Sequence, residues 1–284
     1  MFNLHLTAEQ IEFRDTVRSF AMNEIRPLAI HPERLESFDK PLLRVLLDKA
    51  SELGLRTLTL SEESGGVGAD TMTSCIVFEE LAAGDVDIAI TLGQTSLLGD
   101  LLFDSWMEND QKVSFLPQFI EDETFHLSCA GRIPEISNSW CYHGNLHEEP
   151  KAGLTAVREG NEWIIDGSVS YVANAPIAEL FIVMAETGSN GTGADGTKGL
   201  LVSRNTPGFT INASKNAVGE SDINWRHGCG TGVEFNSCKV PLENQICKHE
   251  KTLVIGEHYS RQISLQTAEA LRVCAQRVFL LGEK

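Results

Sequence analysis

Three glycines have the spacing of a dinucleotide-binding loop. Gly191, Gly193 and Gly196 form a literal GxGxxG. Such a fingerprint opens a helix, whose N-terminus then faces the pyrophosphate of the cofactor. The residues that follow, 198–202 (KGLLV), favour a strand instead. We therefore interpret the three glycines as a flexible hairpin loop and not as a dinucleotide site.

One cysteine and two histidines could in principle converge on a metal ion. Cys141, His143 and His147 lie close together in the chain, and their side chains are common zinc ligands. Gly144 and Pro150 indicate a loop, however, which lacks the fixed geometry of helical spacing, and no fourth ligand is evident. We interpret this stretch as a solvated loop.

Two pairs of neighbouring carboxylates could be read as acid/base pairs. They are Glu62 with Glu63 and Glu79 with Glu80. Neighbouring side chains on a helix diverge by about 100°, so the two carboxylates of a pair would not face one substrate atom. We interpret both pairs as surface charge.

Composition narrows the choice of partners. The 284 residues carry a formal net charge of -17, which would repel phosphate backbones and anionic lipid. We expect neither nucleic acid nor a membrane surface as a partner. No apolar stretch approaches the roughly 20 residues that span a bilayer, and no signal pattern follows Met1. The expected location is the cytoplasm.

The cysteines fit a reducing compartment. They are odd in number, scattered, and never spaced as CxxC, which argues against a disulfide framework and a structural zinc site. We expect reduced, mostly buried thiols. The seven are Cys75, Cys129, Cys141, Cys229, Cys238, Cys247 and Cys274.

Helical patterns fill the first third of the chain. Thr7 and Gln10 fit a capping box, and apolar residues then recur at helical spacing until Pro27, where we expect the helix to break. A second helix is expected over 41–53, ending at Gly54. Further helices are expected over 71–83, 88–103 and 109–120.

Near residue 121 the hydrophobic period changes from that of a helix to that of a strand. Short strands are expected over 125–132, 154–159, 162–170, 180–186, 199–203, 209–213 and 232–240. Within residues 162–174 (EWIIDGSVSYVAN) we expect a strand, an Asp166-Gly167 turn, a second strand and a loop. From residue 252 the pattern is helical again.

The expected fold class is therefore α+β with several domains. We expect an N-terminal α-helical domain over 1–121 and a middle antiparallel β-barrel domain over 122–243. Residues 244–284 would begin a C-terminal helical bundle, because a single amphipathic helix must pack on other elements.

Several segments, in this order, resemble the acyl-CoA dehydrogenase family. Residues 6–10 with Phe13 look like the opening helix of the family, and 61–68 look like its Pro-Glu-x-x-Gly-Gly-x-Gly loop. Residues 78–82 look like the helix that follows, and Lys239-Val240-Pro241 closes the middle domain as in the family. The resemblance covers essentially the whole chain.

The resemblance implies a cofactor, a substrate and partners. In the family, FAD lies between the middle domain and the C-terminal helices, with an acyl-CoA thioester on its ring. A carboxylate removes the α proton while the β hydride passes to the flavin. An electron-transfer flavoprotein or a similar acceptor then takes the electrons, and members assemble as homo- or hetero-oligomers.

The flavin-side residues of the family are carried over one by one. The family's Cys-x-Thr-Glu-Pro falls on residues 129–133, so that Cys129 matches and Gly131 replaces the Thr. Its Trp-x-Thr falls on Tyr171 and Ala173, and Ser137 falls near its substrate-contacting Ser. Two lost side-chain hydrogen bonds would weaken flavin binding by about 1–3 kcal/mol. Taken without the family, Tyr171 is a strand-end aromatic packing on the barrel.

The resemblance does not supply a catalytic base. Arg261 matches a substrate-side Arg, and Ser260 stands where some relatives carry the catalytic Glu. Glu257 is a nearby carboxylate that would face elsewhere. The other base position of the family lies in its C-terminal bundle, beyond the residues of this chain.

Three functions follow. The first is an FAD-dependent acyl-CoA dehydrogenase that carries out α,β-dehydrogenation of a CoA thioester. The second is a degenerate, non-catalytic subunit beside an active paralogue, suggested by Gly131, Ala173 and Ser260. The third is a flavin-dependent monooxygenase relative, which needs no α-proton base.

Overall fold

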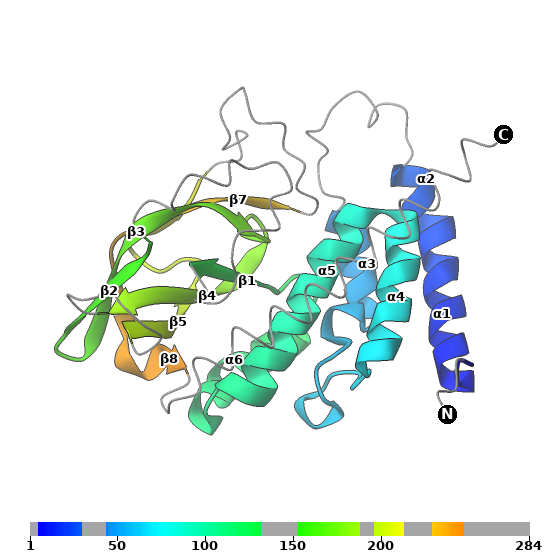
Figure 1. The fold of residues 1–284 in the computed structure, drawn as a ribbon, viewed down its shortest axis with the longest axis horizontal. Helices are drawn as coiled ribbons and strands as arrows, with labels where there is room; N and C mark the ends of the chain where they lie inside the picture. The colour runs from blue at the N-terminus through cyan, green and yellow to red at the C-terminus, as the bar shows by residue number, and fades with distance from the viewer. Residues whose placement is uncertain (1–4, 30–43, 132–152, 188–195, 213–228, 247–284) are drawn as a thin grey trace.

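The structure is a computed structural model, and it describes residues 5–29, 44–131, 153–187, 196–212 and 229–246. A group of helices lies beside a curved β-sheet (Figure 1). The expected order, a helical part followed by a β part, is confirmed. The predicted boundaries of the three domains stay predictions.

The first helix begins as expected but continues past its proline. Helix α1 (Ala8–Phe20) has the predicted capping box between Thr7 and Gln10. It runs into a π-helical turn, η1 (Ala21–Ile25), and then into α2 (Arg26–Ala29). The expected break at Pro27 is therefore wrong. Pro27 is the second residue of α2 and follows the wider π-helical turn, so the helix is irregular at the place where a proline ring would clash with a regular α-helical turn.

The other helices follow the predicted order. Gly54, with φ 78°, follows the second helix as predicted. Their bounds are α3 (Arg44–Glu52), η3 (Leu55–Thr57), η4 (Glu62–Ser64), α4 (Thr71–Gly84), α5 (Val86–Gly99), η5 (Asp100–Trp106) and α6 (Asn109–Glu121).

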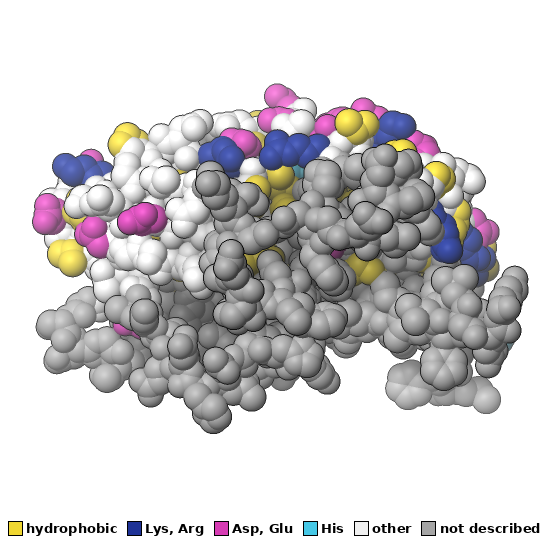
Figure 2. Space-filling model, turned by 90° about the horizontal axis from the view of Figure 1, so that it is seen from above, with side chains coloured by type: hydrophobic (Ala, Val, Ile, Leu, Met, Phe, Trp, Pro, Cys, Tyr) yellow, Lys and Arg dark blue, Asp and Glu magenta, His cyan; other side chains and the backbone are white. Residues whose placement is uncertain are grey.

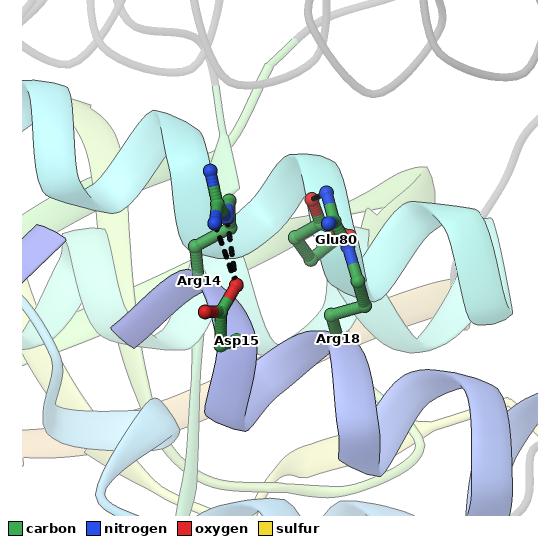
Figure 3. A network of polar contacts seen from close by, with 4 residues as sticks. All are labelled: Arg14, Asp15, Arg18 and Glu80. Atoms are coloured by element: carbon green, nitrogen blue, oxygen red, sulfur yellow. Dashed lines mark hydrogen bonds and ion pairs between the residues drawn. The ribbon is translucent and has the colours of Figure 1, made fainter. Parts of the chain in front are cut away.

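An ion pair fastens α1 to α4. Arg18 donates from Nε and Nη2 to the two carboxylate oxygens of Glu80, at 2.9 and 2.5 Å. Figure 3 shows Arg18 of α1 reaching Glu80, and beside it Arg14 paired with its neighbour Asp15. Glu80 is only 6% exposed, so its assignment to surface charge is wrong. A helix position that faces α1 can hold a carboxylate because Arg18 neutralises it.

One helix is long and apolar enough to cross a membrane by length and composition. It is the continuous run of α5 and η5, Val86–Trp106, with 21 residues and a mean hydropathy of 1.3. The expectation that no stretch approaches this length is wrong. Inside the fold 72% of this apolar window is buried. Packing at the centre of the molecule explains the composition of this helix, because core helices are commonly as long and as apolar as a membrane span.

The β part is one mixed sheet. Its strands lie in the order β6-β7-β3-β2-β4-β5-β8, with β1 paired to β4. The β1–β4 and β2–β4 pairs are parallel and the others antiparallel, so the expected all-antiparallel pairing holds only in part. The bounds are β1 (His126–Gly131), β2 (Thr155–Glu159), β3 (Glu162–Ala173), β4 (Ala178–Thr187), β5 (Thr197–Ser203), β6 (Phe209–Ile211), β7 (Gly230–Pro241) and β8 (Gln245–Ile246).

The prediction of a turn at Asp166-Gly167 is also wrong, because strand β3 continues through both residues. Gly167, with φ 125°, instead sits at a bulge in the β3–β7 ladder. The hairpin turn lies earlier, at Gly160 and Asn161, where Glu159 pairs with Glu162. Gly160 has φ 61° at the first central position, as a type II′ turn requires.

A shared core joins the helices to the sheet. We call it the interface core. It contains buried side chains from α5, η5, α6, β1, β4, β5 and β8, including Leu97, Leu101, Phe119, Leu127, Leu180, Ile182, Leu201 and Ile246. The rings of Phe103 and Phe119 stack within it at 5.0 Å. The sheet and the helices therefore bury apolar surface against one another.

Candidate functional site

The structure brings together the two strand ends that sequence predicts to hold a cofactor. Cys129 and Gly131 lie on β1, and Tyr171 and Ala173 end β3. The Ser128 hydroxyl donates to the Ala173 carbonyl oxygen at 2.6 Å, which places the two strands side by side. Ser137, Glu257, Ser260 and Arg261 lie outside the described residues, as do Gly191, Gly193, Cys141, His143 and His147.

Gly131 has a backbone that excludes a side chain. Its φ is 99°, and a Cβ added there would lie 2.2 Å from the carbonyl oxygen of Met184 on the paired strand β4. A threonine could not adopt this conformation. The hydroxyl that the family usually carries here is therefore absent together with the backbone geometry that would present it.

Cys129 faces the helices. Its side chain packs against the interface core, and the residue as a whole is partly buried. Burial raises the pKa of this thiol to about 12. A neutral, shielded thiol is a poor nucleophile, so Cys129 contributes packing and main-chain groups.

Tyr171 lies against the facing strand. The β3–β7 ladder shifts register between Val169 and Val172, and Tyr171 lies in that bulge. A Cβ added to Gly230 would be 2.3 Å from Cζ of the Tyr171 ring. Gly230 thus leaves the space that the ring fills, and Ala173 pairs with Gly230 in the ladder. This position is compatible with both interpretations of Tyr171, a strand-end aromatic that packs on the sheet and a residue on the flavin side of the site.

A buried polar network lies behind the two strand ends, and the sequence reading did not identify it. Asn174, with φ 62° and 1% exposure, donates from Nδ2 to the Thr91 carbonyl oxygen at 2.9 Å and to Thr95 Oγ1 at 3.2 Å. Thr95 Oγ1 lies 3.0 Å from Nδ1 of His126. Cys229 contacts Asn174 twice, through its carbonyl oxygen at 2.6 Å and through its thiol at 3.7 Å. The only sequence signal was an Asn directly after a strand, since Asn tolerates positive φ better than most residues.

The turn after Asn174 is also fixed. Arg204 donates from its guanidinium to the carbonyl oxygens of Ala175, Pro176 and Ala178, at 2.9–3.2 Å. Asn174 itself accepts main-chain bonds from Ile177 and Ala178. Every polar contact here holds the chain just beyond Ala173 in one conformation.

Charges of both signs are mixed on one face of the molecule. Figure 2 shows basic and acidic side chains next to one another on that face, with single hydrophobic side chains between them. In the part of the chain that the structure describes, no group of three or more His, Cys, Asp or Glu side chains could hold a metal ion.

The architecture combines a helical part with a β-sheet packed on it, and the ends of β1 and β3 meet beside helix α5. Two family profiles identify the class of protein that has this arrangement. Residues 7–123 match the family profile described as acyl-CoA dehydrogenase, N-terminal domain, and residues 147–233 match its middle domain. The chain belongs to the acyl-CoA dehydrogenase family.

Curated relatives agree with this assignment. The chain is 26% identical over 243 residues to the mitochondrial isobutyryl-CoA dehydrogenase of Dictyostelium discoideum, covering 86% of this chain and 53% of the relative. It is 28% identical over 257 residues to the short-chain-specific acyl-CoA dehydrogenase of Clostridium acetobutylicum, covering 89% and 62%. The chain thus spans between about half and two thirds of the length of these relatives.

Solved structures share the fold. Butyryl-CoA dehydrogenase from Megasphaera elsdenii has a TM-score of 0.76 at 23% identity, covering 97% of this chain and 67% of that one. A glutaryl-CoA dehydrogenase from Mycobacterium smegmatis in complex with FADH2 has a TM-score of 0.72 at 20% identity, covering 94% and 64%. At these identities the likeness establishes the fold.

Proposed function

We propose that this chain is an FAD-dependent oxidoreductase that carries out α,β-dehydrogenation of an acyl-CoA thioester. One observation carries the proposal. The chain has the N-terminal and middle domains of the family in order, and β1 and β3 meet through the bond from Ser128 to Ala173. An electron-transfer flavoprotein or a similar acceptor would take up the electrons.

The residues present fit FAD through their main chain. Among the described residues, the ladder hydrogen bonds of β1 are to β4 alone. Main-chain N–H and C=O groups of residues 129–131 suit the polar edge of a flavin, and the half-buried Tyr171 offers an aromatic face. Gly131 and Ala173 provide no hydroxyl. When bound, FAD would supply the hydride acceptor.

The chain's own part in the reaction is binding and orientation. The ends of β1 and β3 would hold the ring, and dehydrogenation also needs a base within hydrogen-bond reach of the α carbon. We propose Arg261 and Ser137 as substrate contacts, on the resemblance alone. By the same resemblance Ser260, which has no carboxylate, stands at one base position of the family.

Flavin binding tests the proposal directly. Purified full chain is titrated with FAD and its absorption spectrum recorded, and we expect flavin bands that remain with the protein after gel filtration. Ala173→Thr restores a hydroxyl and should tighten FAD binding by up to about tenfold. Val157→Thr, on the exposed face of β2, is the control and should change nothing. A chain that stays colourless with excess FAD would rule the proposal out.

The second candidate is a non-catalytic subunit beside a flavin-bearing partner. The closed backbone at Gly131 favours it, since a simple side-chain loss would leave room for a hydroxyl. Affinity purification from the native source distinguishes the two. A separate flavin-bearing chain that co-purifies supports a subunit, whereas a flavin-replete homo-oligomer excludes it.

A further inference from the structure

A single threonine on α5 contacts both strands of the proposed flavin site. Thr95 is fully buried, and its Oγ1 lies between Asn174 Nδ2, at 3.2 Å, and His126 Nδ1, at 3.0 Å. Asn174 directly follows the end of β3, and His126 is the first residue of β1. Helix α5 runs next to β1 in Figure 1.

The hydrogen bonds of this network meet at the Thr95 hydroxyl. The Asn174 amide can only donate from Nδ2, so Thr95 Oγ1 accepts from it. Thr95 Oγ1 also bonds His126 Nδ1 at 3.0 Å, as donor or as acceptor according to the tautomer of the imidazole. Burial, with the nearby Arg56 cation, lowers the pKa of His126 to about 3, so the imidazole is neutral at physiological pH. The chain runs from β3 through α5 to β1.

We propose that Thr95 and Asn174 are positioning residues that set the relative placement of β1 and β3 at the flavin-binding edge. The inference rests on the proposed function and adds residues that do not touch the cofactor. Asn174 holds its left-handed conformation while bonding to α5, and Ser128 links the same strand ends nearer the cofactor edge. A shift of either strand would move residues 129–131 relative to residues 171–173.

Two valine substitutions on α5 test the proposal in the full chain. Thr95→Val keeps the shape of the side chain and removes the hydroxyl. Thr91→Val, one turn earlier and equally buried, is the matched control. The Thr91 hydroxyl makes no hydrogen bond to Asn174, Thr95 or His126, and the Thr91 carbonyl, which accepts from Asn174, is unchanged by the substitution. Asn174→Gly is a second variant, because glycine accepts φ 62° without strain.

Two measurements are made on each variant: the dissociation constant for FAD and amide hydrogen exchange by mass spectrometry. We expect Thr95→Val and Asn174→Gly to weaken FAD binding about tenfold or more. Both should also speed exchange in residues 126–131 and 171–174, while Thr91→Val does neither. Equal behaviour of the Thr95 and Thr91 variants overturns the proposal, as does faster exchange with unchanged FAD affinity.

The exchange measurement separates this inference from the proposed function. Wild-type protein that binds no FAD would defeat the proposed function. Local exchange would still decide whether Thr95 positions the two strands, because it needs no cofactor. Slow, wild-type exchange in the Thr95 variant would then overturn the positioning role on its own.

Discussion

At the scale of single residues, the backbone conformation of Gly131 excludes a side chain from the candidate site. Alanine there would face both an unfavourable φ of 99° and a contact of 2.2 Å with the Met184 carbonyl oxygen. We expect Gly131→Ala to lower the free energy of unfolding by about 3 kcal/mol. Gly160→Ala is the control, since φ is 61° there and nothing lies within 4 Å of the added Cβ. It should cost only about 1 kcal/mol.

Urea unfolding of the two glycine variants gives both values. Equal losses would mean that strand β1 relaxes around residue 131. In that case Gly131→Thr could regain the hydroxyl of the family, and its FAD affinity should be measured next.

His126 makes stability depend on pH. Its pKa is about 3 in the folded protein and about 6.5 in an unfolded chain. Between these values the unfolded state binds a proton that the folded state does not, so stability falls as the pH falls. The contribution is at most about 1.4 kcal/mol per pH unit.

The wild type is compared with His126→Asn, whose amide oxygen can still accept from Thr95 but does not titrate. Unfolding free energies measured between neutral pH and about pH 5, where carboxylates remain ionised, should fall more steeply for the wild type. Parallel curves would show that His126 takes up its proton in the folded protein as readily as in the unfolded chain.

At the scale of elements, the bidentate pair between α1 and α4 allows a matched test on one helix. Arg18→Lys replaces a guanidinium fork with a single ammonium beside the buried Glu80. We expect a loss of about 1 kcal/mol in unfolding free energy, because Arg18 is half exposed and water screens the pair. Arg14, one turn earlier, pairs with its neighbour Asp15, and Arg14→Lys should cost roughly 0.3 kcal/mol or less. If chemical denaturation showed equal losses of unfolding free energy for the two variants, the bidentate Arg18–Glu80 pair would have no special role in stability.

Sequence predicted the elements well where the signal was local. Thr7 with Gln10 and Gly54 marked helix ends correctly, because capping and left-handed glycine depend on a few neighbouring residues. Asp166-Gly167 misled because a glycine with positive φ suits a bulge as well as a turn, and the partner strand β7 decides between them. The choice depends on contacts between residues distant in sequence.

The candidate site also contains residues that the sequence located and residues that it did not. Strand patterns and the family resemblance located Cys129, Gly131, Tyr171 and Ala173 on two strands. The network of Thr95, Asn174 and His126 could not be predicted, since its members are distant in sequence and each is unremarkable alone. Only the packing of α5 against the sheet brings them together.

At the scale of the molecule, the interface core joins the helices to the sheet, and we expect the two parts to unfold as one unit. Leu127 of β1 is fully buried within it, between helices and strands. We expect Leu127→Ala to lower the free energy of unfolding by about 3 kcal/mol, through lost burial and the cavity left behind. Val157→Ala, at a position that is 60% exposed on β2, should change it by roughly 0.5 kcal/mol or less.

Hydrogen exchange shows whether Leu127→Ala destabilises the helical part and the sheet equally. If the two parts unfold together, Leu127→Ala speeds the exchange of α4 and of β3 by the same factor, although α4 belongs to the helical core and β3 to the sheet. If β3 alone exchanges faster, the helical part is stable by itself, and the two parts are independent units in contact. The first result is expected because the apolar side chains of α5 and α6 that enter the interface core would otherwise be left facing water.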